Sequence, residues 1–454
     1  MLPKIRIISV IAFVFIFVLA VNYFYFYGAE IKQKEEMQQQ SEYDNQKIRQ
    51  LERAIDVMLT KINEYNLTLS LPPVQPTVPP TVPPTEPPTE ETIKKMARDM
   101  VQGRLDPFDA NNVITSKDML TYFISNFNKN RKVLNADKFK LAPNHIPIVI
   151  RVFNKPQYFK VVLDFYRQVE GIEETMIIVS HDGIFKEMFD LVESIDFCQV
   201  RQIIHPYSSQ VLSNRFPGKD PQLARERKDE DNGKPRNNNV TPLKHHFWWH
   251  LNYVWDVMLP EHKGDICLLE EDHLPSYDFY RTLLATRDLR NKECPDCFAL
   301  QMQEPSFNGD THDLGICPNI GNMGLTFDRR RWEILRGAGD EYCNFDDYNW
   351  DWTLQHMKSV NKIPGKYFFT CKPRIIHIGT CGIHGRDNNN CEVTKEQIDQ
   401  YKARSDELKR DNAHDWSKYK IRDFMNTNNA LHFRGYESWG QMDRDHCNNQ
   451  KFDI

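Results

Sequence analysis

The stretch that decides the fold is IPIVIRVFNKPQYFKVVLDFYRQV, from Ile146 to Val169. Its first nine residues, IPIVIRVFN, form a nearly continuous apolar run, which is typical of a buried β-strand. The residues after Pro156 place apolar side chains on one face of a helix, at Tyr158, Val161, Val162, Phe165 and Val169. The stretch therefore predicts a strand followed by a helix that packs against it.

The same order repeats downstream, in the strand TMIIVSHD (175–182), the helix IFKEMFDLVESI (184–195) and the strand CQVRQIIHP (198–206). Strands that are apolar at nearly every position must be covered on both faces, which predicts a mostly parallel sheet flanked by helices. The aromatic segment 243–259 predicts a further helix, and DICLLEEDH (265–273) a later strand. We therefore expect an open α/β domain over residues 105–454.

The N-terminus carries the apolar run IRIISVIAFVFIFVLAVNYFYFY, residues 5–27. About 20 apolar residues suffice to cross a bilayer as a helix. Lys4 and Arg6 favour a cytosolic N-terminus. We expect a cytosolic tail (1–6), a transmembrane signal-anchor (7–27) and a lumenal remainder; the alternative is a cleaved signal peptide.

Residues 28–104 predict a lumenal stem. Apolar residues at spacings of three and four over about 44–66 predict a short coiled coil that pairs two copies, or else an amphipathic helix on a stalk. The Pro/Thr-rich segment 72–89 predicts an extended spacer. Two sequons, NLT at Asn66 and NVT at Asn239, predict N-glycosylation in the lumen.

Composition narrows the function classes. The net charge is -5 and no long basic run occurs, which argues against a nucleic-acid partner. Ten cysteines in a lumenal chain favour disulfides. The CPDC motif of Cys294 and Cys297 fits a disulfide better than zinc, because no second CxxC lies at finger spacing. Cys267, inside an apolar strand, is expected to be a buried thiol.

The acids that end the strand 265–273 point to a cation. Unpaired charges are excluded from a strand interior, so Glu270, Glu271 and Asp272 belong at its exposed end and need a positive partner. His377 also follows an apolar run, in RIIHIGTCGIH. A carboxylate with an imidazole suits manganese, and magnesium is the alternative. A lone histidine is more often structural, but the combination with Asp272 favours a ligand.

Other strands also end in polar residues. Asn154 and Asp182 each follow an apolar strand, and open α/β sheets bind ligands at that edge. This predicts recognition of a nucleoside, with turn or cap residues as the alternative. The chain contains no P-loop and no GxGxxG, so phosphates would be held by the metal and by Lys244, His245 and His246.

The segment CNFDDYNWDWTLQ, residues 343–355, alternates aspartates with aromatic residues. Aromatic faces stack on sugars, and one aspartate could act as a general base. The alternative is a helix N-terminus in which an aspartate caps the helix and the tryptophans join the core.

Five motifs, KHHFWWH, LLEEDH, GNMGL, DDYNWDWTLQ and RIIHIGTCGIH, follow one another in this order between about residues 115 and 454. Together they closely resemble the N-acetylglucosaminyltransferase II family. The resemblance implies a Golgi type II membrane enzyme of the nucleotide-diphospho-sugar transferase (GT-A) fold. It would transfer GlcNAc from UDP-GlcNAc in β-1,2 linkage to the α-1,6-linked mannose of N-glycan cores on glycoproteins, by an inverting, metal-dependent single displacement. The alternatives are a sibling transferase for another mannose arm, a Golgi lectin without catalysis, and a membrane tether that acts through its stem.

The resemblance also implies roles by position. Asp272 and His377 would hold manganese, and Asp351 would be the catalytic base. Tyr348, Trp350 and Asn322 would bind the acceptor. The donor would be bound by Arg151, Val152, Phe153, Asn154, Lys155, Asp182, Pro242, Leu243, Lys244, His245, His246 and Glu271.

The cysteines follow the family only in part. Its pattern implies the disulfides Cys294–Cys297, Cys343–Cys447 and Cys381–Cys391. Cys317 and Cys371 would form a pair specific to this lineage, and Cys198 has no evident partner. The aromatic triplet after the two histidines, FWW at 247–249, is a mild departure from the family motif.

Overall fold

The structure, a computed structural model, describes residues 117–130, 132–209, 211–212, 215–218, 236–304, 313–382, 391–411, 419–425, 438–450 and 452. The expected membrane span, the stem with its coiled coil, Asn66 and the domain boundary at residue 105 lie outside this part of the chain. Within it, no helix combines the length and apolar character needed to cross a membrane.

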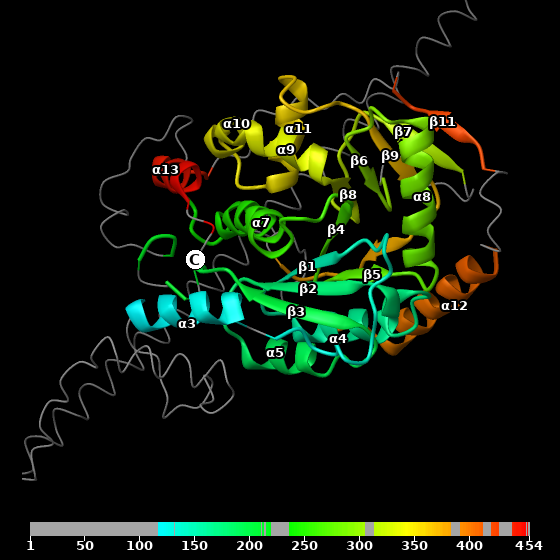
Figure 1. Cartoon of the computed structure of the whole chain (residues 1–454), viewed down its shortest axis with the longest axis horizontal. Helices are drawn as coiled ribbons and strands as arrows, with labels where there is room; N and C mark the ends of the chain where they lie inside the picture. The colour runs from blue at the N-terminus through cyan, green and yellow to red at the C-terminus, as the bar shows by residue number, and fades with distance from the viewer. Residues whose placement is uncertain are drawn as a thin grey trace, which may run out of the picture. The chain divides into compact units, whose positions relative to one another are not determined.

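A central sheet organises the described residues (Figure 1), with nine strands in the order β11-β7-β9-β6-β8-β4-β1-β2-β3. The strands are β1 Ile148–Val152, β2 Met176–His181, β3 Gln199–Ile204, β4 Asp265–Glu270, β6 Ala299–Gln301, β7 Leu314–Cys317, β8 Leu325–Asp328, β9 Tyr367–Thr370 and β11 Ile421–Asp423. A separate two-stranded ribbon pairs β5 His273–Pro275 with β10 Ile375–His377.

Most neighbouring strands run parallel, which confirms the predicted sheet. β4, β1, β2 and β3 form a continuous parallel block. β8 runs antiparallel to both β4 and β6, and β7 runs antiparallel to β9. The carboxyl ends of β1, β2 and β4 therefore meet at one edge of the sheet, where open α/β sheets bind ligands.

Helices cover both faces of the sheet. They are α3 Lys117–Asn130, α4 Pro156–Tyr166, α5 Lys186–Glu193, α7 Pro242–Asn252, α8 Phe279–Glu293, α9 Arg329–Gly337, α10 Gly339–Asn344, α11 Trp350–Ser359, α12 Lys395–Asp411 and α13 Gln441–Asn449. The described residues also form two short helical segments, η2 Ile172–Glu174 and the π-helical η3 Tyr253–Met258. In Figure 1, α4 and α5 lie on one side of β1–β3, and α7 lies on the other.

The alternation of side chains along β1 explains the two layers. Ile148 and Ile150 enter the core that α4 covers, whereas Val149 enters the core that α7 covers. All three are fully buried, and each such side chain contributes about 1.5–3 kcal/mol to folding. Helix α4 begins at Pro156, where the missing N–H has no helical partner to lose.

The β5–β10 ribbon positions the residues that matter most for the site. Its antiparallel register places His273 opposite His377. The Ile378 N–H also donates to the Asp272 carbonyl oxygen at 3.0 Å. The turn after β4 and the end of β10 are thereby held side by side at the edge of the sheet.

Candidate active site

A cavity of about 960 Å³ opens at the carboxyl ends of β1, β2 and β4, a volume within the usual range for small-molecule sites. Residues from the sheet edge, from the start of α7 and from the start of α11 surround it. Sixteen residues predicted from the sequence line this cavity: Arg151, Val152, Phe153, Asn154, Lys155, Asp182, Pro242, Leu243, His246, Glu271, Asp272, Asn322, Tyr348, Trp350, Asp351 and His377.

The end of β1 joins the two sides of the cavity. Arg151 forms an ion pair with Glu270 at the end of β4. Its guanidinium carbon also lies 5.0 Å from the ring centre of Phe247 and 4.9 Å from that of Trp350. These two rings stack at 4.0 Å between their centres. Strand β1 is therefore connected to both α7 and α11 through one buried side chain.

Phe153 presents an aromatic face to the cavity. Its side chain is 45% exposed, which is unusual for a phenylalanine beside a strand end. Its backbone N–H donates to Glu271 Oε2 at 2.7 Å, and its ring packs edge-on against Phe185. The ring is thus held in place while its exposed part remains free to stack on a planar ligand.

The end of β2 contributes Asp182, which is buried and accepts a hydrogen bond from His205 Nδ1 at 3.1 Å. The His205 ring stacks on His246 of α7, with 5.1 Å between ring centres. His246 Nε2 in turn lies 2.7 Å from Ser180 Oγ. His205 thus contacts both Asp182 and His246 and holds these two side chains in place at the cavity.

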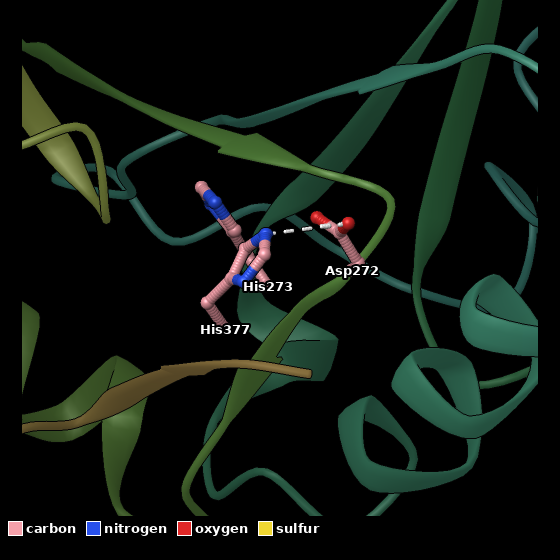
Figure 2. Close-up of side chains that lie close together, drawn as sticks. All are labelled: Asp272, His273 and His377. Atoms are coloured by element: carbon pink, nitrogen blue, oxygen red, sulfur yellow. Dashed lines mark ion pairs between the residues drawn. The ribbon is translucent and has the colours of Figure 1, made fainter. Parts of the chain in front are cut away.

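Asp272 and His377 form the most polar part of the cavity (Figure 2). Asp272 Oδ2 lies 3.4 Å from His377 Nε2 and 3.6 Å from Lys155 Nζ. Burial alone would raise the pKa of Asp272, but the hydrogen bond with His377 and the nearby positive charges hold it below its ordinary value. The same hydrogen bond raises the pKa of His377. The Asp272 carboxylate therefore stays ionised and accepts a positive partner.

This pair fits a divalent cation. A carboxylate and an imidazole that face an open cavity leave further coordination positions for substrate oxygens or water. Gly379 leaves room beside them, because a Cβ at this position would lie 2.1 Å from Asp272 Oδ2. Among the described residues, Asp272, His273 and His377 are grouped closely enough to hold a metal ion.

His273 is a less suitable ligand than the other two. Its Nδ1 accepts the Glu270 N–H at 3.2 Å, so the proton of the neutral ring is on Nε2. Nε2 is buried without a hydrogen-bond partner. A metal ligand needs a free lone pair, which this tautomer does not offer on Nε2. The arrangement therefore favours Asp272 and His377 as the ligands.

Glu271 differs from its neighbour Asp272. Burial raises its pKa to about 8, although Lys155 and the Phe153 N–H lower it and the acids on either side raise it. Its contact with the Phe153 backbone gives it a structural task at the end of β1. The two consecutive acids thus have different partners. Asp272 pairs with the positively charged groups of Lys155 and His377, whereas Glu271 accepts a backbone N–H.

Asp351 lines the same cavity from the first turn of α11. Its Oδ1 accepts the Trp352 N–H at 2.9 Å. Burial raises the pKa of Asp351 to about 6, and the charges of Glu270 and Asp347 add to this effect. A carboxylate with this pKa is deprotonated near neutral pH yet remains basic, which suits a general base. Tyr348 and Asn322 line the cavity nearby.

Comparison with known proteins gives the family. The model of the N-acetylglucosaminyltransferase II family matches residues 122–447. The chain belongs to the N-acetylglucosaminyltransferase II family. It is similar to the alpha-1,6-mannosyl-glycoprotein 2-beta-N-acetylglucosaminyltransferases of Arabidopsis thaliana (38% identity) and Homo sapiens (33% identity). The alignments cover 57% and 60% of this chain, and 64% and 67% of those proteins.

Two solved structures found by comparison resemble this family member weakly. One is S. aureus TarS, at 11% identity and a TM-score of 0.30, covering 58% of this chain and 42% of that chain. Another is the mannosyltransferase PcManGT from Pyrobaculum calidifontis in complex with GDP-Man and Mn²⁺, at 12% identity and a TM-score of 0.27, covering 62% and 66%. Similarity at this level supports no conclusion about this chain.

Two predicted donor residues of this N-acetylglucosaminyltransferase II family member do not reach the cavity. Lys244 and His245 are fully buried and are absent from its lining. Lys244 Nζ donates to the Phe345 carbonyl at 2.8 Å, and His245 Nε2 bonds Asp443 Oδ1 at 2.8 Å. The helical twist of α7 turns these two side chains away from the cavity in this structure, while His246 faces it.

The cysteines fulfil three of the four expected pairings. Disulfides join Cys294–Cys297, Cys343–Cys447 and Cys381–Cys391. The expected pair of Cys317 and Cys371 is wrong, since both are buried free thiols. The antiparallel register of β7 and β9 places Cys317 opposite Tyr367, while the Cys371 N–H bonds Asp313 at the other end of β7. Cys198 and Cys267 are also buried thiols.

Several cavity residues lie outside the site predicted from the sequence: Ser209, Asn349, Gly379 and Gly382. Glu270, from the acidic strand end, and Trp352, from the aromatic segment 343–355, also line the cavity. The two glycines follow His377 closely in the motif RIIHIGTCGIH, which is the signal that points to them. Asn239, predicted as a glycosylation site, is exposed and also lines the cavity. A glycan on Asn239 would therefore stand at the cavity.

Proposed function

We propose that this protein transfers GlcNAc from UDP-GlcNAc in β-1,2 linkage to the α-1,6-linked mannose of N-glycan cores. Membership of the N-acetylglucosaminyltransferase II family supports the activity. The observation that carries the proposal is the cavity itself, which is lined both by a metal-compatible pair, Asp272 and His377, and by Asp351, a carboxylate of raised pKa. The proposed fold is the nucleotide-diphospho-sugar transferase (GT-A) type.

The donor would lie along the sheet edge. The exposed face of Phe153 suits a uracil ring, and Asp182 suits the hydroxyls of a ribose. Asp272 and His377 would hold manganese, with magnesium as the alternative, and that cation would neutralise the departing diphosphate. Lys155, which now lies beside Asp272, supplies a second positive charge for the same phosphates.

The acceptor would lie against α11. Asp351 accepts the proton of the mannose 2-hydroxyl as that oxygen attacks the anomeric carbon of GlcNAc and the bond to UDP breaks. Tyr348, Trp350 and Asn322 would orient the sugar. Because attack and departure occur on opposite faces of one carbon, the product has the β configuration.

We also propose a Golgi location, with a single type II span at residues 7–27 and the catalytic domain in the lumen. The apolar run at the N-terminus and the three disulfides support this assignment. The stem at 28–104 would hold the catalytic domain away from the membrane and could pair two copies through its coiled coil.

A transfer assay with the full-length chain tests the function. UDP-GlcNAc and manganese are supplied with two N-glycan acceptors, one exposing only the α-1,6 mannose and one only the α-1,3 mannose. We expect β-1,2-GlcNAc on the first acceptor alone, and no transfer once a chelator removes the metal. Transfer to the second acceptor alone would identify a sibling transferase. Glycan binding without any transfer would identify a lectin.

A further inference from the structure

Lys244 is buried in a place where a charge is costly. It lies in the first turn of α7, beside Pro242 and Leu243, which line the cavity, yet its own side chain is fully buried. The ammonium donates to the Phe345 carbonyl at 2.8 Å and lies 4.4 Å from the ring centre of Trp439. A buried ammonium group is unfavourable without such partners, so these contacts fix the side chain.

The Phe345 carbonyl begins a line of hydrogen bonds that reaches Asn349, two residues before the candidate base Asp351. The same oxygen accepts the Asp347 N–H at 2.9 Å. Asp347 is fully buried, and its Oδ1 accepts both the Asn349 N–H at 2.7 Å and the Asn349 side-chain amide at 3.2 Å. Asn349 immediately precedes α11, whose second residue is Asp351. Lys244 is thus bonded to the turn that precedes α11 and sets the position of Asp351 in the first turn of that helix.

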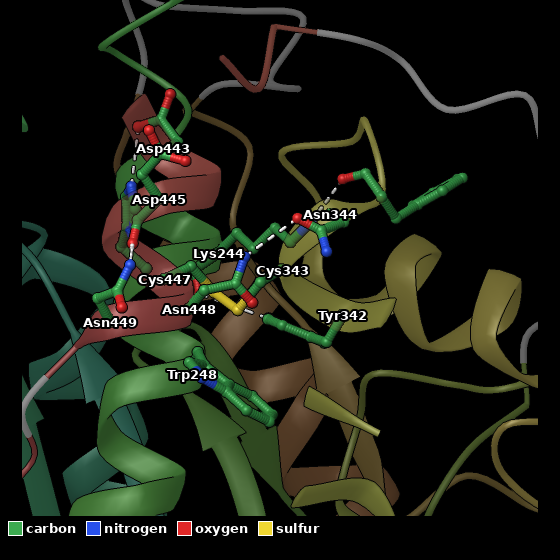
Figure 3. Close-up of a disulfide and its surroundings, with 12 residues drawn as sticks. Lys244, Trp248, Tyr342, Cys343, Asn344, Asp443, Asp445, Cys447, Asn448 and Asn449 are labelled. Carbon is green, nitrogen blue, oxygen red and sulfur yellow. Dashed lines mark hydrogen bonds and ion pairs between the residues drawn. A yellow bond between two sulfur atoms is a disulfide. The ribbon is translucent and has the colours of Figure 1, made fainter. Parts of the chain in front are cut away.

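The other end of this connection is firmly anchored. The neighbouring His245 bonds Asp443 of α13, and Asp443 also accepts a hydrogen bond from Arg236 Nε at 2.6 Å. Helix α13 is joined to α10 by the disulfide Cys343–Cys447, next to which Lys244 lies in Figure 3. Because α7 is held in this way, the hydrogen bond from Lys244 to the Phe345 carbonyl fixes the turn 345–349 relative to α7.

We propose that Lys244 is a positioning residue, which sets the turn 345–349 and thereby the placement of Tyr348 and Asp351 relative to the donor wall. The inference rests on the proposed function. Displacing a catalytic group by about 1 Å can cost on the order of 10²-fold in rate. Loss of the Lys244 contact therefore impairs transfer to the acceptor without removing any group that touches the nucleotide.

Two matched substitutions in the full-length protein test this role. Lys244→Met removes the donor but keeps the unbranched apolar stem. Lys358→Met is the control, because Lys358 Nζ also donates to a backbone carbonyl, that of Pro318 at 2.7 Å. Lys358 lies on α11, the helix that carries Asp351. Lys358 does not line the cavity. Lys358 is half-buried, so comparing the two variants separates the loss of a lysine–carbonyl bond in general from the loss of the Lys244–Phe345 bond.

For Lys244→Met we expect kcat to fall roughly 10- to 100-fold and the acceptor KM to rise. The affinity for UDP in the presence of manganese, measured by calorimetry, should stay within about twofold of wild type because no donor contact is lost. Hydrogen exchange in peptides covering 345–351 should become faster. Lys358→Met should lower the melting temperature but leave the kinetic constants and exchange in 345–351 unchanged.

Several results would overturn the positioning role. Unchanged kcat and acceptor KM in Lys244→Met would contradict it. A loss of UDP affinity in this variant would also contradict it, because it would show that Lys244 contributes to donor binding. An equal loss of turnover in Lys358→Met would show that the lower rate of Lys244→Met results from general destabilisation of the fold. If wild type itself does not transfer GlcNAc, the proposed function fails, and the exchange comparison alone then decides whether Lys244 orders the turn.

Discussion

The Oδ2 atom of Asp272 and the Nε2 atom of His377 lie 3.4 Å apart because two short strands pair, not because the residues are close in sequence. The β5–β10 register sets His273 against His377, and the Ile378 N–H bonds the Asp272 carbonyl. Backbone contacts thus hold the side chains together before any cation arrives. A preformed pair of this kind reduces the ordering cost of binding a metal.

Replacing Asp272 tests the metal pair directly. In Asp272→Ala, UDP affinity measured with manganese should fall to the value that wild type shows with a chelator, because the ionised oxygen that attracts the cation is gone. Calorimetric titration of UDP with and without manganese checks this. If the variant kept a clear manganese dependence of UDP binding, the metal would have to bind elsewhere.

Gly379→Ala tests the space around the same carboxylate. A Cβ at Gly379 would lie 2.1 Å from Asp272 Oδ2 and 3.2 Å from a carbon of the His377 ring, so the carboxylate must move. We expect weaker manganese-dependent UDP binding with little change in the circular dichroism of the fold. Gly337→Ala is the matched control, since nothing lies within 4 Å of its added methyl group. Equal effects of both substitutions would contradict the explanation.

Asp351→Asn tests the base. Removing a general base typically lowers turnover about 10²- to 10⁴-fold. UDP affinity should remain, because Asp351 stands on α11 and not at the metal pair. Initial rates at saturating donor and acceptor, together with a UDP titration, measure both quantities. Near-normal turnover in this variant would exclude Asp351 as the base.

The pH dependence of kcat/KM gives an independent check on Asp351. Its pKa is raised to about 6, and only the ionised form accepts a proton. On the acid side of about pH 6 the rate should therefore fall roughly tenfold per pH unit, and above it the dependence should level off. The residual activity of Asp351→Asn should lack this acid limb. A limb that persists in the variant would assign the titration to another group.

The strands that the site depends on could be predicted from the sequence because their apolar runs are unambiguous. Ile146–Asn154 and DICLLEEDH become β1 and β4, and the polar residues that follow them meet at one edge as expected for parallel strands. The link between Asp272 and His377 was less accessible. It depends on pairing of the three-residue strands β5 and β10, whose register no local pattern specifies.

The direction of individual side chains was the part that the sequence could not supply. Lys244, His245 and His246 are consecutive, yet only His246 faces the cavity, because successive residues of a helix point about 100° apart. Their residue types alone suggest phosphate binding for all three. The pairing of Cys317 with Cys371 failed for a related reason, since a strand register and not the number of cysteines decides which sulfurs meet.

The Cys343–Cys447 disulfide should stabilise the fold far more than the Cys294–Cys297 disulfide does. Cross-linking restricts the unfolded chain more when the closed loop is longer, and the sequence separations are 104 and 3 residues. Replacing Cys343 and Cys447 by alanine should lower the stability by about 2–5 kcal/mol. Replacing Cys294 and Cys297 removes the same atoms from buried positions and serves as the control. Urea denaturation of both double variants measures the difference, and an equal or larger loss from the short loop would show that packing at the sulfurs outweighs the constraint on the unfolded chain.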